Sequence, residues 1–292
     1  MPNLKNAPHI QSLFLLLIAM VSMQSSGALA KSLFTQFPVL TISAMRLMLG
    51  ALILAIIFQA WKINFKQVKW SAIISYGIAL AGMNALFYLS IQRLPLGIAV
   101  SFEFIGPLSV ALYYARQKFD FIWVGLAIIG LILLFPFQQA SQSLDLIGIG
   151  FALGAGACWA LYIVAGQKPS GVSGNHTVCL GMFIGMLCLM PIALISGMSS
   201  NVFQPSNLMY FIALAALASA LPFTLEMIAL RNLTALSFGT LMSVEPAIAA
   251  FSGFIFLGGQ LAWNQWLALA TIITASIGCT YTTQQAKKKS GI

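Results

Sequence analysis

Two fourteen-residue stretches decide the architecture: Leu94–Pro107, LPLGIAVSFEFIGP, and Leu233–Pro246, LTALSFGTLMSVEP. The second lies 139 residues after the first, and each places a Leu near its start and a proline at its end inside an apolar run. The segments that follow, which begin at Trp123 and Trp266, match at an offset of 143. This order and spacing predicts two related halves. Chance similarity between hydrophobic helices is the alternative.

The composition predicts an all-α integral membrane protein. Of the 292 residues, 60% are apolar and 7% are charged, whereas soluble domains carry roughly a quarter charged residues. A membrane crossing needs about 20 apolar residues, so the chain has room for ten helices. The apolar runs place them near 12–30, 39–59, 70–91, 96–115, 121–137, 146–166, 177–197, 207–230, 236–257 and 262–283.

Five helices fall in each half, over residues 12–137 and 146–283. Because five is an odd number, the second half enters the membrane from the opposite side. We therefore expect an inverted repeat, the architecture of many secondary transporters.

The basic residues report the orientation of the chain. With a cytoplasmic N-terminus, eleven positive side chains fall on inner segments and two, Lys31 and Arg93, on outer loops. We expect an inner-membrane protein, and this bias predicts that both of its termini lie in the cytoplasm. The net charge of +9 forms no basic stripe with interleaved aromatic residues, so nucleic-acid binding is not expected.

Three other patterns receive plain structural interpretations. Lys5, the apolar run 13–21 and the triplet 28–30 resemble a signal peptide, but an uncleaved first helix is favoured because no soluble domain follows. The four cysteines lie in apolar runs, where they pack as small hydrophobic residues. No cluster of thiols and histidines suggests a metal, and no cofactor is expected.

Two carboxylates near helix prolines are the leading candidate site. A charge at the centre of a membrane helix costs about 2.5–3.5 kcal/mol on insertion scales. Glu103 stands one turn before Pro107, and Glu245 directly precedes Pro246. Each proline breaks or loosens its helix and frees a carbonyl one turn upstream. Such a carboxylate can attract a substrate ammonium group or cycle a proton.

Four further residues are candidates for substrate binding or coupling: Arg46, Asn84, Tyr88 and Glu226. Arg46 can meet a substrate carboxylate; the alternative is a buried ion pair with one of the proline-adjacent acids that only fixes packing. Asn84 and Tyr88 lie at i and i+4, where they can bind a polar solute or hydrogen-bond another helix. Glu226 lies five residues from Arg231, toward the cytoplasmic end of its helix.

Motifs for other classes of protein are missing from the sequence. No phosphate-binding Gly-x-x-x-x-Gly-Lys-Ser/Thr segment exists, so no ATPase activity is expected in this chain. No Ser/His/Asp arrangement supports a membrane enzyme. An uncoupled facilitator of small metabolites or lipids stays open as the second hypothesis.

Several longer strings resemble one family. They are 29–34 (LAKSLF), 82–84 (GMN), 86–92 (LFYLSIQ), 95–100 (PLGIAV), 153–160 (LGAGACWA), 225–230 (LEMIAL), 238–243 (FGTLMS) and 245–247 (EPA). The chain resembles the drug/metabolite transporter superfamily in its EamA branch, and within it the bacterial exporters of threonine and homoserine.

The resemblance implies a ten-helix, two-repeat basket that exports small amino acids, with the proton as coupling ion. Asn84, Glu226 and Glu245 fall within matching strings, and Glu103 follows one of them by three residues. The chain departs from the family at Gly259 and Gln260, where an acidic residue often follows Phe-Leu-Gly. Any part of that acid in gating is therefore in doubt here. The oligomeric state is not indicated.

Overall fold

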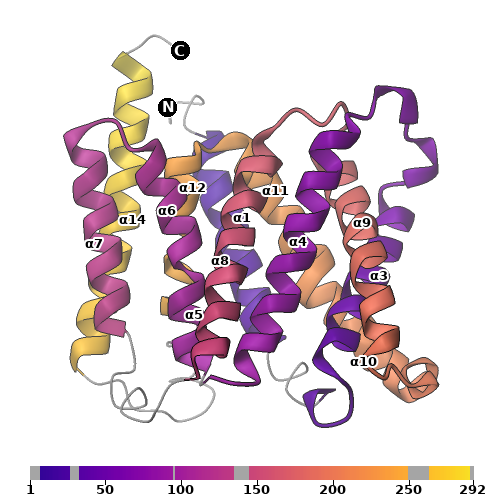
Figure 1. Cartoon of the computed structure of the whole chain (residues 1–292). Coiled ribbons are helices and arrows are strands. Elements are labelled where there is room, and N and C mark those ends of the chain that lie inside the picture. Colours follow the sequence, from indigo (N-terminus) through magenta and orange to yellow (C-terminus); the bar gives the residue numbers. More distant parts are fainter. Residues whose placement is uncertain (1–6, 27–32, 95, 135–144, 249–262, 290–292) are drawn as a thin grey trace.

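The computed structural model is a bundle of helices that run in roughly one direction (Figure 1). It describes residues 7–26, 33–94, 96–134, 145–248 and 263–289. The helices are α1 (Ala7–Ser25), α3 (Val39–Ile57), α4 (Trp70–Ile91), α5 (Leu96–Glu103), α6 (Ile105–Tyr114), α7 (Lys118–Leu134), α8 (Leu146–Gln167), α9 (Gly174–Ile195), α10 (Pro205–Ala215), α11 (Leu221–Asn232), α12 (Ala235–Met242) and α14 (Trp263–Lys289).

Each of the ten predicted ranges contains helix among the described residues. Within the described ranges, six helical segments are long and apolar enough to cross a membrane, and shorter apolar helices occupy Gln11–Ser25, Ile98–Tyr114 and Ala235–Ile248. The structure thus confirms an all-helical membrane fold, while the count of ten crossings stays a prediction. The predicted ends at 27–30, 135–137 and 249–257 lie outside the described residues, as does the family departure at Gly259 and Gln260.

The packing joins helices that are far apart in sequence. Helix α4 lies along α8 and α9, α3 packs on α9, and α1 packs on α11. At one edge of the bundle α7 lies beside α14, and α6 lies beside α12 (Figure 1). Helix α1 begins and α14 ends at the same end of the bundle. These pairings bring the first and second halves of the chain into one apolar core.

The predicted helix at 96–115 is two helices with a break at Phe104, three residues before Pro107. Helix α12 likewise ends before Ser243, three residues before Pro246, and helix resumes over 244–248. Proline has no N–H for the carbonyl four residues earlier and its ring clashes with it, which explains both positions. The predicted helix breaks at Pro107 and Pro246 are therefore present one turn upstream.

A third irregularity was not predicted. The range 207–230 is not one α-helix, because a π-helical turn, η6 (Ala216–Ala220), separates α10 from α11. Pro222 explains the location: it offers no N–H to the carbonyl of Ala218, which therefore has no α-helical partner. Such π turns often mark functional positions.

One close backbone contact fixes the broken helix. A methyl group added to Gly106 would lie 2.0 Å from the carbonyl oxygen of Gly156 on α8, and one added to Gly156 would lie 2.6 Å from that of Glu103. Only glycine fits at these two positions. Helix α8 therefore touches the backbone at the point where α5 gives way to α6.

Candidate functional site

The three intramembrane glutamates are buried. Glu103 is the last residue of α5, Glu226 lies in α11, and Glu245 follows the break after α12. Their exposed fractions are 7%, 4% and 9%. Among the described residues none of the three forms a salt bridge. The site therefore holds three carboxyl groups, and no cation of the described part of the chain is in direct contact with them.

The three glutamates share one electrostatic neighbourhood, which we call the row: Glu245 interacts with both Glu103 and Glu226. The Gln24 amide of α1 donates a hydrogen bond to Glu245 Oε1 over 3.5 Å. The row thus draws one acid from the first half of the chain and two from the second.

Tyr162 on α8 holds the Glu226 end of the row. Its hydroxyl donates to Glu226 Oε2 over 3.0 Å, and its ring lies 4.9 Å from that of Tyr76. One turn before it, Trp159 packs edge-on against Phe104 with ring centroids 4.8 Å apart. Its indole Nε1 is buried and has no hydrogen-bond partner among the described residues. A polar ligand with an acceptor atom would satisfy this donor.

Arg46 occupies a separate buried position on α3, 4% exposed. Its guanidinium donates to the Tyr88 hydroxyl, to Ser219 Oγ at 3.1 Å from Nε, and to the carbonyl of Ala218. The expected alternative of an ion pair with Glu103 or Glu245 is wrong. The π turn explains this, because the carbonyl that Pro222 leaves free accepts from the arginine instead.

Asn84 and Tyr88 do not act as a pair. The Asn84 amide donates back to the carbonyl of Leu80 over 2.8 Å, so its side-chain oxygen is the atom left to accept. Tyr88 binds Arg46 and packs edge-on against Phe34, with centroids 5.2 Å apart. Both side chains are buried. The interhelical interpretation of Tyr88 is the one that the contacts support.

The sequence predictions did not single out Tyr162, Trp159 or Ser219. A usable signal existed for the first two, since a Tyr and a Trp three residues apart share one face of an apolar helix. Ser219 becomes a partner of Arg46 through the π turn alone. No group of three His, Cys, Asp or Glu residues in the described ranges is arranged to hold a metal.

Comparison with known proteins gives the family. The sequence profile of the EamA-like transporter family matches residues 146–281. The threonine/homoserine exporter RhtA of Escherichia coli strain K12 is 46% identical over 98% of this chain and 97% of its own length. The chain belongs to the EamA-like transporter family. The exporter of the same name from Salmonella typhimurium strain LT2 is 49% identical over 92% of this chain and 91% of its own.

Two more distant matches cover nearly the whole chain. An uncharacterized transporter, YwfM of Bacillus subtilis, is 24% identical over 91% of the chain and 92% of its own length. One solved crystal structure, 17% identical, superposes with a TM-score of 0.72 over 95% of this chain and 99% of that one. At that identity the likeness supports the fold alone.

Proposed function

We propose that this EamA-like transporter exports threonine, homoserine or similar small amino acids by proton-coupled alternating access. The row of three buried carboxyl groups without a paired cation carries the proposal. Exporters named for threonine and homoserine at 46–49% identity support the substrate class.

The core offers both a cation and acids, as a zwitterion requires. Ser219, which binds Arg46, precedes Glu226 by seven residues on the same helical segment, or roughly 10 Å along its axis. Arg46 would meet the carboxylate of the amino acid through the donors that its three neutral partners do not use. Glu245 or Glu103 would meet the ammonium group. Asn84 can add its free amide oxygen.

The same acids would carry the coupled proton. Glu245 interacts electrostatically with both Glu103 and Glu226, so a proton held by one of these acids lowers the cost of a charge on its neighbour. Competition between a proton and the substrate ammonium for one carboxylate is sufficient to link the two fluxes. No metal, cofactor or ATPase subunit enters this scheme.

The two broken helices support the inverted repeat. Helices α5 and α12 each have eight residues, and both of their ends are offset by 139 residues, the offset of the sequence repeat. Each is followed by a one-residue break, at Phe104 and at Ser243. We place both termini in the cytoplasm of a bacterial inner membrane, as the basic loops indicate.

Flux in proteoliposomes tests the function. We expect outwardly directed threonine or homoserine flux to accelerate with a pH gradient and to lose that acceleration in Glu103→Gln and Glu245→Gln. Exchange of labelled for unlabelled substrate separates coupling from binding, because it needs no net proton movement. Asp145→Asn is the matched control, since Asp145 is an acid outside the spans.

Two outcomes would count against the proposal. Wild-type flux that ignores the gradient, or labelled lipid crossing the bilayer, would favour the uncoupled facilitator. Unchanged coupled flux in both glutamine variants would remove the assigned roles of these acids.

A further inference from the structure

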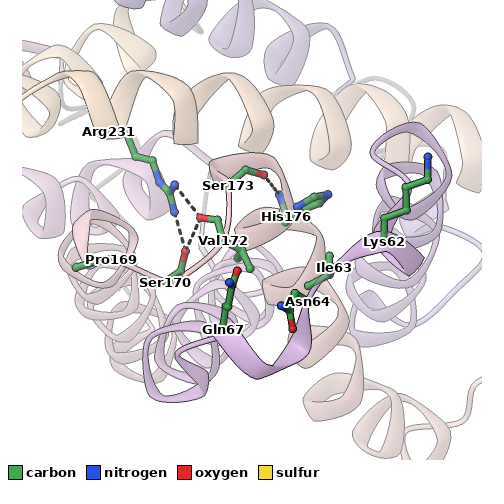
Figure 2. Close-up of a pocket in the computed structure, with 11 residues that line it drawn as sticks. Lys62, Ile63, Asn64, Gln67, Pro169, Ser170, Val172, Ser173, His176 and Arg231 are labelled. Carbon is green, nitrogen blue, oxygen red and sulfur yellow. Dashed lines mark hydrogen bonds between the residues drawn. The ribbon is translucent and has the colours of Figure 1, made fainter.

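A cavity of about 510 Å³ opens between three segments at the end of the bundle that carries the basic loops (Figure 2). One wall is the 60–69 connection between α3 and α4, the second is the turn between α8 and α9, and the third is the end of α11. Its lining comprises Lys62, Ile63, Asn64, Gln67, Pro169, Ser170, Gly171, Val172, Ser173, His176 and Arg231. Among these described residues two are basic, one is a histidine and none is acidic.

Arg231 supplies the best-held positive charge. Its Nη2 donates to Ser170 Oγ over 2.9 Å and to Thr177 Oγ1 over 2.8 Å, and its Nη1 donates to the carbonyl of Val172 over 3.2 Å. These bonds fix the guanidinium on the turn and use three of its five N–H donors. The partners are all neutral, so the charge is not cancelled by an acid.

His176 stands in the first turn of α9, which forms part of the second wall. In Figure 2, His176 lies between Arg231 and Lys62. Its Nε2 lies 2.9 Å from the carbonyl of Phe58, an acceptor, so Nε2 carries the hydrogen. Ser173 caps α9, whose 22 residues direct the positive end of the helix dipole at this wall.

The backbone of the turn between α8 and α9 packs tightly against the 60–69 connection. Gly171 has a φ of +78°, and a side chain there would place its Cβ 1.9 Å from the carbonyl oxygen of Gln67. The Lys69 N–H donates to the carbonyl of Ser170 over 2.8 Å. The 60–69 connection and the turn therefore form one continuous rim around the cavity.

The rim carries exposed aromatic side chains beside the cavity. Trp61, Phe65 and Trp70 are 66%, 51% and 43% exposed, and the rings of the last two stack with centroids 6.2 Å apart. The lysines Lys62, Lys66 and Lys69 alternate with them. Tryptophan next to lysine at the end of a membrane helix is the pattern of a segment that lies at the headgroup level of the bilayer.

We propose that this cavity binds the headgroup phosphate of an anionic phospholipid from the surrounding leaflet. Basic pockets between membrane helices bind such headgroups. Arg231 and Lys62 would hold the phosphate, the N-terminus of α9 would donate to it, and the exposed aromatic residues would lie against the adjoining lipid. A soluble phosphate would use the same charges but would leave the aromatic rim without a role. The inference does not depend on what the protein transports.

The test compares two lysines of the same connection. Short-chain phosphatidylglycerol is titrated into the detergent-purified full chain while its thermal unfolding is followed, with phosphatidylcholine and inorganic phosphate in parallel. Lys62 lines the cavity and Lys66 does not. We expect Lys62→Gln to raise the half-saturating phosphatidylglycerol concentration about fivefold, the usual effect of one basic residue near anionic lipid, and Lys66→Gln to change it by less than about twofold.

Three outcomes overturn the proposal. Equal effects of the two lysine variants would mean diffuse attraction to the surface. Equal stabilisation by inorganic phosphate would assign the cavity to a soluble anion, and equal stabilisation by phosphatidylcholine would remove the need for charge. If Lys62→Gln lowers the unfolding midpoint without lipid, Trp61→Ala replaces it. That variant should weaken phosphatidylglycerol binding and leave any response to inorganic phosphate unchanged.

Discussion

Gly156→Ala should destabilise the protein although alanine is the better helix former. Both Gly156 and Gly150 lie in α8, so replacing either with alanine gains roughly 0.5–1 kcal/mol of helix propensity. At Gly150 the new methyl group meets no atom within 4 Å. At Gly156 it lies 2.6 Å from the carbonyl oxygen of Glu103 and 3.3 Å from the N atom of Gly106. Relieving that overlap must move α8 away from the break, at a cost of about 1–3 kcal/mol.

Thermal unfolding of the two alanine variants in one detergent, followed by flux in vesicles, measures the difference. We expect Gly150→Ala to unfold at or above the wild-type midpoint with normal flux. Gly156→Ala should unfold at a lower midpoint and lose flux, because Glu103 moves with its backbone. A Gly156→Ala protein as stable and as active as Gly150→Ala would show that α8 does not hold the broken helix.

Three further predictions concern charges and the π turn. Arg46→Lys keeps the charge but loses the planar fork, so we expect the KM for amino-acid efflux to rise about tenfold, equivalent to roughly 1.4 kcal/mol; a change in maximal rate alone would contradict substrate contact. Pro222→Ala restores an N–H that can bind the carbonyl of Ala218, so flux should fall while the unfolding midpoint is kept or raised; unchanged flux would contradict a role for the turn. The hydrogen bond from Arg93 is the main cause that lowers the pKa of Asp145 from its ordinary value of 3.8. Because the pKa is lower in the folded state, ionised Asp145 stabilises the fold above that ordinary value, and this stabilisation is lost as pH falls through the folded pKa. Asp145→Asn should therefore make the unfolding midpoint less dependent on pH between about pH 5 and 3. An unaltered pH profile would contradict a contribution from the Arg93–Asp145 pair.

Hydropathy and proline chemistry predicted most of the fold. The ten apolar ranges fall on helices because a membrane helix must bury its backbone polar groups internally, which makes its length readable from composition. The breaks before Pro107 and Pro246 were predictable because the missing N–H acts within one turn. Pro222 carried the same information, but it lies inside a continuous apolar range, which predicted one uninterrupted helix.

The partners of the site residues were less predictable. An ion pair with a proline-adjacent acid was the alternative interpretation of Arg46, yet Arg46 binds neutral oxygens, because a π turn that depends on Pro222 presents a free carbonyl to it. The approach of Glu226 to Glu245 depends on how α11 and α12 pack, which no local pattern specifies. Tyr162 reaches Glu226 from 64 residues away in the chain.

The scarcity of acids gives the buried row a practical consequence. The chain has five acidic residues, and the two outside the row are committed to backbone amides: Asp145 caps α8, and Asp120 accepts from the N–H groups of Arg116 and Gln117. A lipid-soluble carbodiimide, which modifies carboxyl groups in apolar surroundings, would therefore meet three targets in one place. The extent of labelling then reports how many of these carboxyl groups are accessible, and a substrate that binds one of them should lower the labelling of that group.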